Sequence, residues 1–211
     1  MQTRRVAARA AVGITAVGTL TLACVGLYEN TAYTLRRVRV PVLAPGAPPL
    51  RGLHLSDLHV TPRQHSKLAW LSDLARLVPD AVALTGDVLS HPKAVEPLLA
   101  ALRPLFGFPG VFVPGNNDYH CPTLKSPHRY LQRNREPRPR GAPLDWPGFA
   151  RALHEASGWL ELTNARGLLE VGGGRVLDVR GVDDAHLRRD RLDLVSGPPA
   201  PGTELSLGLS H

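Results

Sequence analysis

The chain has 211 residues, enough for one domain with a sizeable apolar core. Apolar residues make up 43% and charged residues 20%, values typical of a globular protein rather than a disordered one. The formal charge of +7 is compatible with an anionic partner but equally with an Arg-rich composition, and the two cysteines, Cys24 and Cys121, lie in such different surroundings that a disulfide is not expected.

The first 28 residues combine a basic start with an apolar run. Residues 10–27 contain no charge and follow three arginines, and their length is near the lower limit of roughly 17–25 residues for crossing a bilayer. We expect residues 1–28 to be a signal anchor with one transmembrane helix. A cleaved signal peptide and a lipoprotein signal ending at Cys24 remain as alternatives. The positive-inside rule then favours an extracytoplasmic domain at the cell membrane.

Residues 29–49 are predicted to be a tether that becomes a first strand. The stretch LRRVRVPVL alternates and is rich in valine, and APGAPP ends it. Residues 50–211 then form the main domain.

Strand and helix patterns alternate after residue 50. Apolar strands are predicted at LRGLHLS, DAVALT and GVFV, and helices at HSKLAWLSDLARLV and KAVEPLLAALRPLF. Repeated strand–helix–strand units predict right-handed crossovers and a parallel sheet. Ligands of such sheets sit beyond the carboxyl ends of the strands.

The second half of the domain is less regular. Residues 121–148 are rich in Arg and Pro and are predicted to be a long excursion. FARALHEASG follows as a short helix, and residues 159–184 are predicted to form antiparallel hairpins with a tight turn at residues 172–174. RRDRLDLV is predicted as a helix fragment, and TELSLGLSH as a strand that ends at His211.

Polar side chains that can donate a ligand atom to a metal ion follow the predicted strands. Each of them alone has a simpler interpretation as a helix cap, a turn residue or a surface histidine. Together they offer carboxylate, imidazole and amide donors, which suit divalent Mn, Fe or Zn. An Asp–x–His pair on an extended chain would also direct both side chains to one face. The candidate ligands are Asp57, His59, Asp87, Asn116, Asn117, Asp118 and His211.

Three motifs, LHLSDLH, ALTGDV and VPGNND, resemble the calcineurin-like metallophosphoesterases in order and spacing. The pattern of that family is D-x-H, G-D, G-N-H-D/E, a lone His and then G-H-x-H. With the N-terminal apolar segment, the arrangement looks most like the membrane-anchored bacterial branch. The resemblance implies an α/β fold, namely the α/β/β/α sandwich of the family. The chain would hold its first βαβαβ half and part of the second sheet, behind an N-terminal transmembrane helix.

The resemblance also implies a function and a site. The protein would hydrolyse phosphoester or phosphodiester bonds through a hydroxide activated by two divalent ions (Mn, Fe, Zn or similar). Asp57 and His59 would bind the first ion, Asp87 would bridge both, and Asn116 and His211 would bind the second. The substrate would be a phosphoester, and the expected membrane anchor favours one of lipid-linked or envelope origin.

Asn117 stands where the family has a histidine. An amide can donate a hydrogen bond to a phosphoryl oxygen but cannot deliver a proton at neutral pH. Three interpretations follow: Asn117 binds substrate electrostatically, His120 or His128 supplies the catalytic proton, or the leaving group needs no acid. A register shift that makes Asn117 the ligand instead of Asn116 is a further alternative.

The G-H-x-H motif is absent from the sequence. We therefore expect a domain that is incomplete at its C-terminus, and the alternative function is a catalytically impaired metal- or phosphate-binding membrane protein. A basic surface protein is a third hypothesis. Nucleic acid is not expected as a partner, because the arginines of residues 129–140 lie in a Pro-rich stretch with a single aromatic residue, Tyr130, which is too little for a stacking platform.

Overall fold

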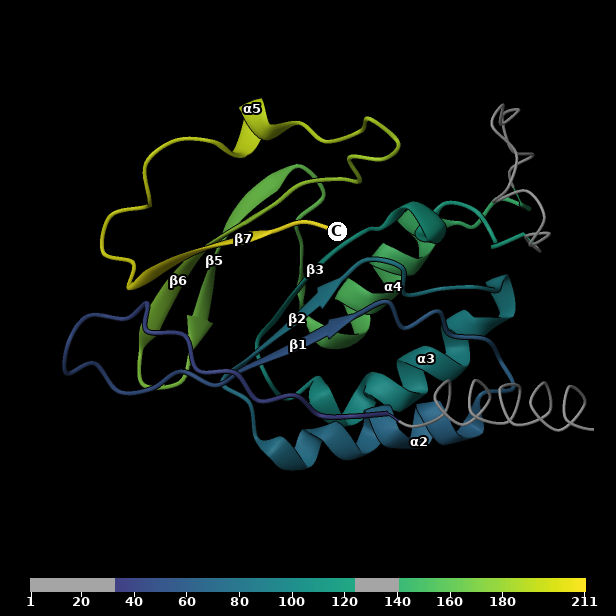
Figure 1. Ribbon diagram of the computed structural model, residues 1–211, viewed down its shortest axis with the longest axis horizontal. Helices are drawn as coiled ribbons and strands as arrows, with labels where there is room; N and C mark the ends of the chain where they lie inside the picture. The colour runs from purple at the N-terminus through teal and green to yellow at the C-terminus, as the bar shows by residue number, and fades with distance from the viewer. Residues whose placement is uncertain (1–32, 124–140) are drawn as a thin grey trace, which may run out of the picture. The chain divides into compact units, whose positions relative to one another are not determined.

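The computed structural model describes residues 33–123 and 141–211. The chain divides into two units, Met1–Arg39 and Val40–His211. The described part of the first unit, residues 33–39, has no helix or strand. The second unit holds both β-sheets and all the helices of the described chain (Figure 1).

The first sheet is parallel throughout. Its strands lie in the order β1 (Gly52–Ser56), β2 (Ala81–Thr85), β3 (Gly110–Val113) and β4 (Leu160–Glu161). All four residues of β3 are buried, which explains its continuous apolar run, since a central parallel strand is covered on both faces. The structure therefore confirms the predicted α/β class and its parallel sheet.

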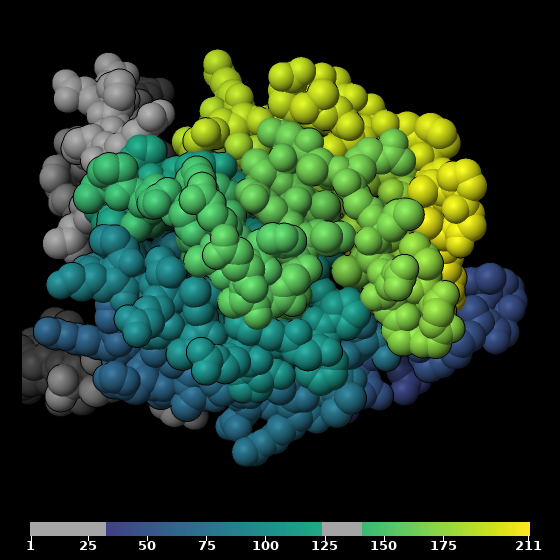
Figure 2. Space-filling model, turned by 180° about the vertical axis from the view of Figure 1, so that it is seen from behind, coloured from purple at the N-terminus to yellow at the C-terminus, as the bar shows by residue number. Residues whose placement is uncertain are grey.

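Three helices cover one face of this sheet. They are α2 (His65–Asp73), α3 (Val95–Leu102) and α4 (Trp146–Ser157), with the short 3₁₀ turns η1 (Leu74–Leu77), η2 (Pro92–Ala94) and η3 (Arg103–Leu105) beside them. Strand side chains alternate between faces, and Leu55, Leu84 and Phe112 point into the core on the helix side. Figure 2 is the view from behind and shows this helix layer, with the teal atoms of α3 beside the green atoms of α4.

The helix α4 begins and ends at residues that its own sequence supplies. The carboxylate of Asp145 accepts the N–H of Gly148 at 2.9 Å as an N-cap, and Gly158 adopts a φ of 72° after the last turn. The helix predicted from FARALHEASG is thus confirmed, with an earlier start at Trp146.

The second sheet packs on the other face of the first. It contains β5 (Ala165–Val171), β6 (Arg175–Gly181) and β7 (Leu205–Leu209); β5 and β6 are antiparallel, and β6 and β7 are parallel. Val111 and Val113 of β3 pack with Val179 of β6 in a separate apolar core. The described residues therefore form a helix layer, a parallel sheet and a mixed sheet.

The outer face of the second sheet carries α5 (Leu192–Val195) and the loop that follows it. Asp178 and Arg180 alternate with inward-facing residues of β6, so they lie on this outer face. Arg180 donates to the carbonyls of Val195 and Gly197 at 3.2 and 2.6 Å. The predicted helix fragment is confirmed as this single turn.

Two predictions about strands are wrong. Residues 33–49 contain no strand, and the first strand is β1; Pro41, Pro45 and Pro48 lack an N–H, and Val38 and Val40 stay exposed. Residues 160–161 join the first sheet as β4 instead of forming a hairpin, because Leu162 donates its N–H to Phe112 and is buried between the sheets.

Two predicted segments fall partly or wholly outside the described residues. The transmembrane helix within residues 1–28 is one of them. Among the residues that the structure does describe, no helix is long and apolar enough to cross a membrane. The excursion of residues 121–148 is described only at its ends, which meet where the N–H of Cys121 donates to the Ala142 carbonyl at 2.8 Å.

Candidate metal centre

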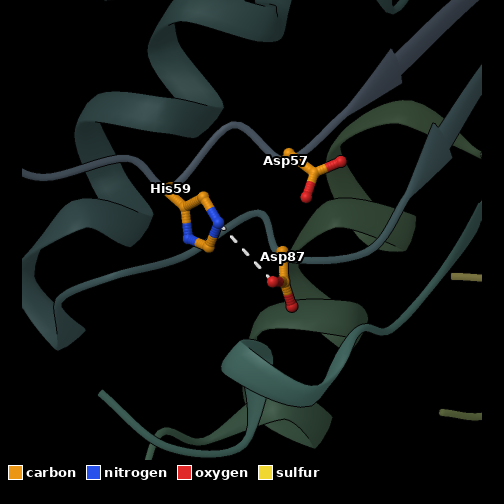
Figure 3. A group of neighbouring side chains, drawn as sticks. All are labelled: Asp57, His59 and Asp87. Atoms are coloured by element: carbon orange, nitrogen blue, oxygen red, sulfur yellow. Dashed lines mark ion pairs between the residues drawn. The ribbon is translucent and has the colours of Figure 1, made fainter. Parts of the chain in front are cut away.

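The loops after β1 and β2 bring three predicted ligands together. Asp57 and His59 follow β1, and Asp87 follows β2. One donor atom from each lies within 4.8 Å of the others. Figure 3 shows the imidazole of His59 facing the carboxylate of Asp87, with Asp57 beside them. This convergence at one sheet edge is what the parallel topology predicts.

The backbone of these loops is held in an unusual conformation. Asp57, His59 and Asp87 have φ values of 53°, 44° and 53°, in the left-handed region that costs about 1–3 kcal/mol for residues other than glycine. Our prediction of an extended Asp–x–His pair is therefore wrong. The two loops hold each other instead, because the N–H of Asp57 donates to the Gly86 carbonyl at 3.2 Å and that of His59 to the Asp87 carbonyl at 2.8 Å.

Asp87 is the centre of the cluster. Its side chain is 6% exposed, against 62% for Asp57 and 38% for His59. Its Oδ2 atom lies 3.5 Å from Nε2 of His59 and 3.5 Å from Nε2 of His211. One buried carboxylate thus faces two imidazoles from opposite ends of the domain sequence, while its neighbours leave the site open to solvent.

His211 reaches the site from the end of β7. Its Nε2 lies 4.0 Å from Oδ1 of Asp57 as well as close to Asp87. Its Nδ1 lies 3.3 Å from the carbonyl of Thr85, which can only accept a hydrogen bond. In the tautomer with the hydrogen on Nδ1, the lone pair of Nε2 would be available to a metal ion. The ring fits because Gly86 has no side chain; a Cβ there would overlap it.

The turn after β3 supplies an amide. This turn, η4 (Asn116–Asp118), places the backbone N–H of Asn117 at 2.8 Å from Oδ1 of Asp87 and its side-chain Nδ2 at 2.5 Å from Oδ2. Asn116 is half-buried on the same turn and makes no hydrogen bond to another described side chain of the cluster. The structure therefore brings Asn117 to the carboxylate of Asp87.

His120 lies apart from these contacts. It forms an isolated β-bridge with Pro143 and is half-buried, and among the described residues it makes no hydrogen bond or ion pair to the cluster. His128 lies outside the described residues.

Asp118 faces away from the ligands. Its side chain is fully buried and accepts the N–H groups of Val88, Leu89 and Gly115 at 2.8, 2.9 and 2.9 Å. Burial raises the pKa of Asp118 to about 6, against the lowering effect of these three N–H donors, and the charge of Asp87 adds to the rise. Both of its oxygens are occupied, so it is not placed as a ligand.

Sequence reasoning missed several polar groups that support the loops. The hydroxyl of Ser90 lies 3.3 Å from Nδ1 of His59, and that of Ser56 lies 2.5 Å from Oδ2 of Asp57. The ammonium of Lys67 donates to the Leu58 carbonyl at 2.6 Å, and burial lowers the pKa of Lys67. Ser56, Ser90 and Lys67 stand at no ligand position of a sequence motif, so these contacts could not be predicted from the sequence alone.

The donor set fits a divalent cation. Carboxylates and imidazoles that converge on one point are typical ligands of Mn, Fe and Zn. The exposed side of the cluster gives an ion a route of entry and leaves room for further oxygen ligands. The fold and the cluster together define an α/β protein with a candidate metal site at the carboxyl edge of its parallel sheet.

The comparisons with known proteins name the family. The profile of the calcineurin-like phosphoesterases matches residues 50–201, so the chain belongs to this family. Among solved structures, the crystal structure of TT1561 of Thermus thermophilus is similar with 19% identity and a TM-score of 0.37. The alignment covers 77% of this chain and 57% of that one. The comparison with curated proteins gives no match.

Proposed function

We propose that the protein is a metal-dependent phosphoesterase that hydrolyses phosphomonoester or phosphodiester bonds. The observation that carries the proposal is the position of buried Asp87 between His59 and His211, with Asp57 beside it. Two divalent ions about 3.5–4 Å apart repel each other, so a shared carboxylate between them is favourable. Membership of the calcineurin-like phosphoesterase family supports hydrolysis of phosphoesters.

The ligands divide into two sets around Asp87. Asp57 and His59 would hold one ion, and His211 would hold the second together with Asn116 or, in the shifted register, Asn117. Ions of the Mn, Fe or Zn kind would supply Lewis acidity at this place, which would lower the pKa of bound water and neutralise phosphoryl charge. The chain itself fixes the donors, because the strained loops after β1 and β2 are hydrogen-bonded to each other.

Asn117 would contact the substrate rather than move a proton. Its amide already donates to Asp87, and its second N–H can donate to a phosphoryl oxygen. An amide has no proton to give at neutral pH, so the leaving group needs another donor or a low pKa of its own. His120, two residues after Asp118, is the imidazole we propose for that role.

The test is hydrolysis by the full chain in detergent with Mn²⁺. Bis(p-nitrophenyl) phosphate and p-nitrophenyl phosphate report diester and monoester cleavage separately. We expect turnover that EDTA abolishes and Mn²⁺ restores, and that falls at least about 10³-fold in Asp87→Asn. The matched control is Asp145→Asn, which changes a carboxylate at the start of α4. Turnover that survives in Asp87→Asn would contradict the proposal.

A second function is favoured by one observation. Asn117 occupies the family's histidine position and donates hydrogen bonds to Asp87. An amide cannot act as a general acid, so this turn brings no acid to the proposed bridging carboxylate. The chain would then bind metal or phosphate at the membrane without turnover. Tight binding of Mn²⁺ or inorganic phosphate with no cleavage of either ester would support this alternative.

We also propose a place for the protein in the cell. Residues 1–28 would anchor it in the cell membrane by a single pass, with the phosphoesterase domain outside the cytoplasm. Its substrate would then be a lipid-linked or envelope-derived phosphoester, and no nucleic acid partner is proposed. Protease digestion of intact spheroplasts tests the side: cleavage of the domain supports this location, and protection contradicts it.

A further inference from the structure

Two loops that are far apart in sequence meet beneath the candidate metal centre. The first, called the Asp87 loop here, contains residues 86–89, and the second, called the η4 turn, contains Gly115 together with η4. They lie after neighbouring parallel strands, β2 and β3. Their relative position decides where the carboxylate of Asp87 points.

Asp118 connects the η4 turn to the Asp87 loop. Its Oδ1 accepts the N–H groups of Val88 and Leu89, and its Oδ2 accepts the N–H of Gly115. The side chain is 0% exposed. The three hydrogen bonds to this buried carboxylate connect the two loops strongly and directionally, because charge-assisted hydrogen bonds are about twice as strong as neutral ones.

Asp87 returns the contact in the opposite direction. Its Oδ1 accepts the backbone N–H of Asn117 at 2.8 Å. The two aspartates thus form a reciprocal pair, in which each carboxylate accepts N–H groups from the other's loop. Asp87 stands in the left-handed region with a φ of 53°, a conformation that persists only when neighbouring contacts hold it.

We infer that Asp118 is a positioning residue that holds the Asp87 loop against the η4 turn and so fixes the bridging carboxylate in the orientation that metal binding needs. The inference rests on the proposed metal centre and deepens it. Asp118 touches neither metal nor substrate, since both of its oxygens are engaged by backbone N–H groups.

Asparagine at position 118 would keep the shape of the side chain but could not accept all three backbone hydrogen bonds. Whichever way its amide is turned, the NH₂ group faces at least one backbone N–H, so a bond is replaced by a contact between donors. Groups that orient metal ligands typically contribute about 10–100-fold to metal affinity. We therefore expect Asp118→Asn to weaken binding of Co²⁺ at least about tenfold.

The experiment uses the full chain and Co²⁺ alone as the probe. Binding is measured by titration, and the visible absorption of the saturated protein reports the ligand geometry. The matched control is Asp184→Asn, which changes another fully buried aspartate outside the cluster. The Oδ1 atom of Asp184 accepts the N–H of Leu187 at a distance of 2.7 Å. We expect a changed absorption spectrum and weakened binding in Asp118→Asn, and neither change in Asp184→Asn. Unchanged affinity and spectrum in Asp118→Asn would overturn the inference.

A measurement on the unmodified chain covers the case in which Asp118→Asn does not fold. Co²⁺ should slow hydrogen exchange at the amides of Val88, Leu89 and Gly115 together, while the amide of Leu187 stays unchanged. Equal exchange with and without bound Co²⁺ would overturn the inference.

The outcomes also separate this inference from the proposed function. Co²⁺ binding that is lost in Asp87→Asn and weakened in Asp118→Asn, without ester cleavage, would support the inference and contradict the phosphoesterase. A chain that binds no Co²⁺ would contradict both.

Discussion

Asp87 is held in place by other residues of its own chain. Four residues contact the carboxylate of Asp87 or the backbone of its loop. They come from the loop after β1, the η4 turn and the end of β7. They are His59, Asn117 through its backbone and side chain, Asp118 and His211. Preorganisation of this kind lowers the reorganisation that accompanies charge development, which is the largest catalytic contribution in many enzymes.

Asn117→His tests whether proton supply limits the rate, because an imidazole at residue 117 would lie at the cluster, whereas His120 makes no contact to it among the described residues. We expect kcat to rise by about 10²-fold for a diester with an alkyl leaving group, because general acid catalysis typically contributes that much. Bis(p-nitrophenyl) phosphate, whose leaving group needs no acid, should show little change. Asn117→Ala is the control, since it removes the hydrogen bond and adds no acid. Equal changes on both substrates would contradict this role of residue 117.

Gly115→Ala tests how closely the site is packed. A Cβ at Gly115 would lie 2.5 Å from the backbone nitrogen and from Oδ1 of Asp87, and 2.7 Å from His211. We expect the methyl group to displace both ligands and to weaken Mn²⁺ binding at least about tenfold, as loss of ligand orientation typically does. Gly107→Ala is the control, because nothing lies within 4 Å of its Cβ. Isothermal titration gives both affinities, and equal values would contradict the packing argument.

At the scale of elements, β7 matters because it delivers His211. The strand pairs with β6, and the ion pair between Arg175 and Glu204 connects the start of β6 to the segment just before β7. Within β6, Arg180 forms an ion pair with Asp178. Asp178 also accepts the hydroxyl of Ser206 on β7 at 3.1 Å. The outer face of the second sheet thus helps to hold the strand that completes the site.

Asp178→Asn should lower the stability of the domain. The Asp178 side chain is 2% exposed and that of Arg180 is 13% exposed, and removing one partner of a buried ion pair costs about 3–5 kcal/mol. Urea unfolding followed by tryptophan fluorescence gives the free energy of unfolding. Asp193→Asn, which changes an exposed pair with Arg191, should leave the midpoint unchanged. Equal effects of both substitutions would contradict the assignment.

The same pair predicts a dependence on pH. The hydrogen bond from Arg180 holds the pKa of Asp178 below its usual range. The stabilisation is therefore complete above the unfolded pKa of about 3.9 and is lost as the pH falls through the lower folded pKa. The difference in midpoint between the unmodified chain and Asp178→Asn should shrink below about pH 4.

The elements could be predicted where periodicity was strong. Helical spacing found α2, α3 and α4, and apolar runs found the strands β1 to β3. The strand expected in residues 29–49 failed because alternation alone does not provide a neighbouring strand to pair with, and prolines interrupt it. The left-handed backbone at Asp57 and His59 could not be read from the sequence, since contacts between the loops hold it.

The fold of the whole domain explains why candidate ligands from residue 57 to residue 211 meet. The parallel sheet aligns the ends of its strands, so the positions of Asp57, His59 and Asp87 followed from topology alone. His211 required the second sheet to pack on the first, and the sequence motif indicated this contact where periodicity could not. The positioning role of Asp118 was hidden, because a buried carboxylate and a ligand carboxylate look the same in sequence.

The most direct test of the metal centre is anomalous diffraction from crystals of the protein grown with Mn²⁺. The account predicts a peak within bonding distance of Asp57, His59 and Asp87, and a second about 3.5–4 Å away on the side of His211, with Asp87 between them. Mn²⁺ bound elsewhere, with these four side chains unliganded at saturating metal, would contradict the account.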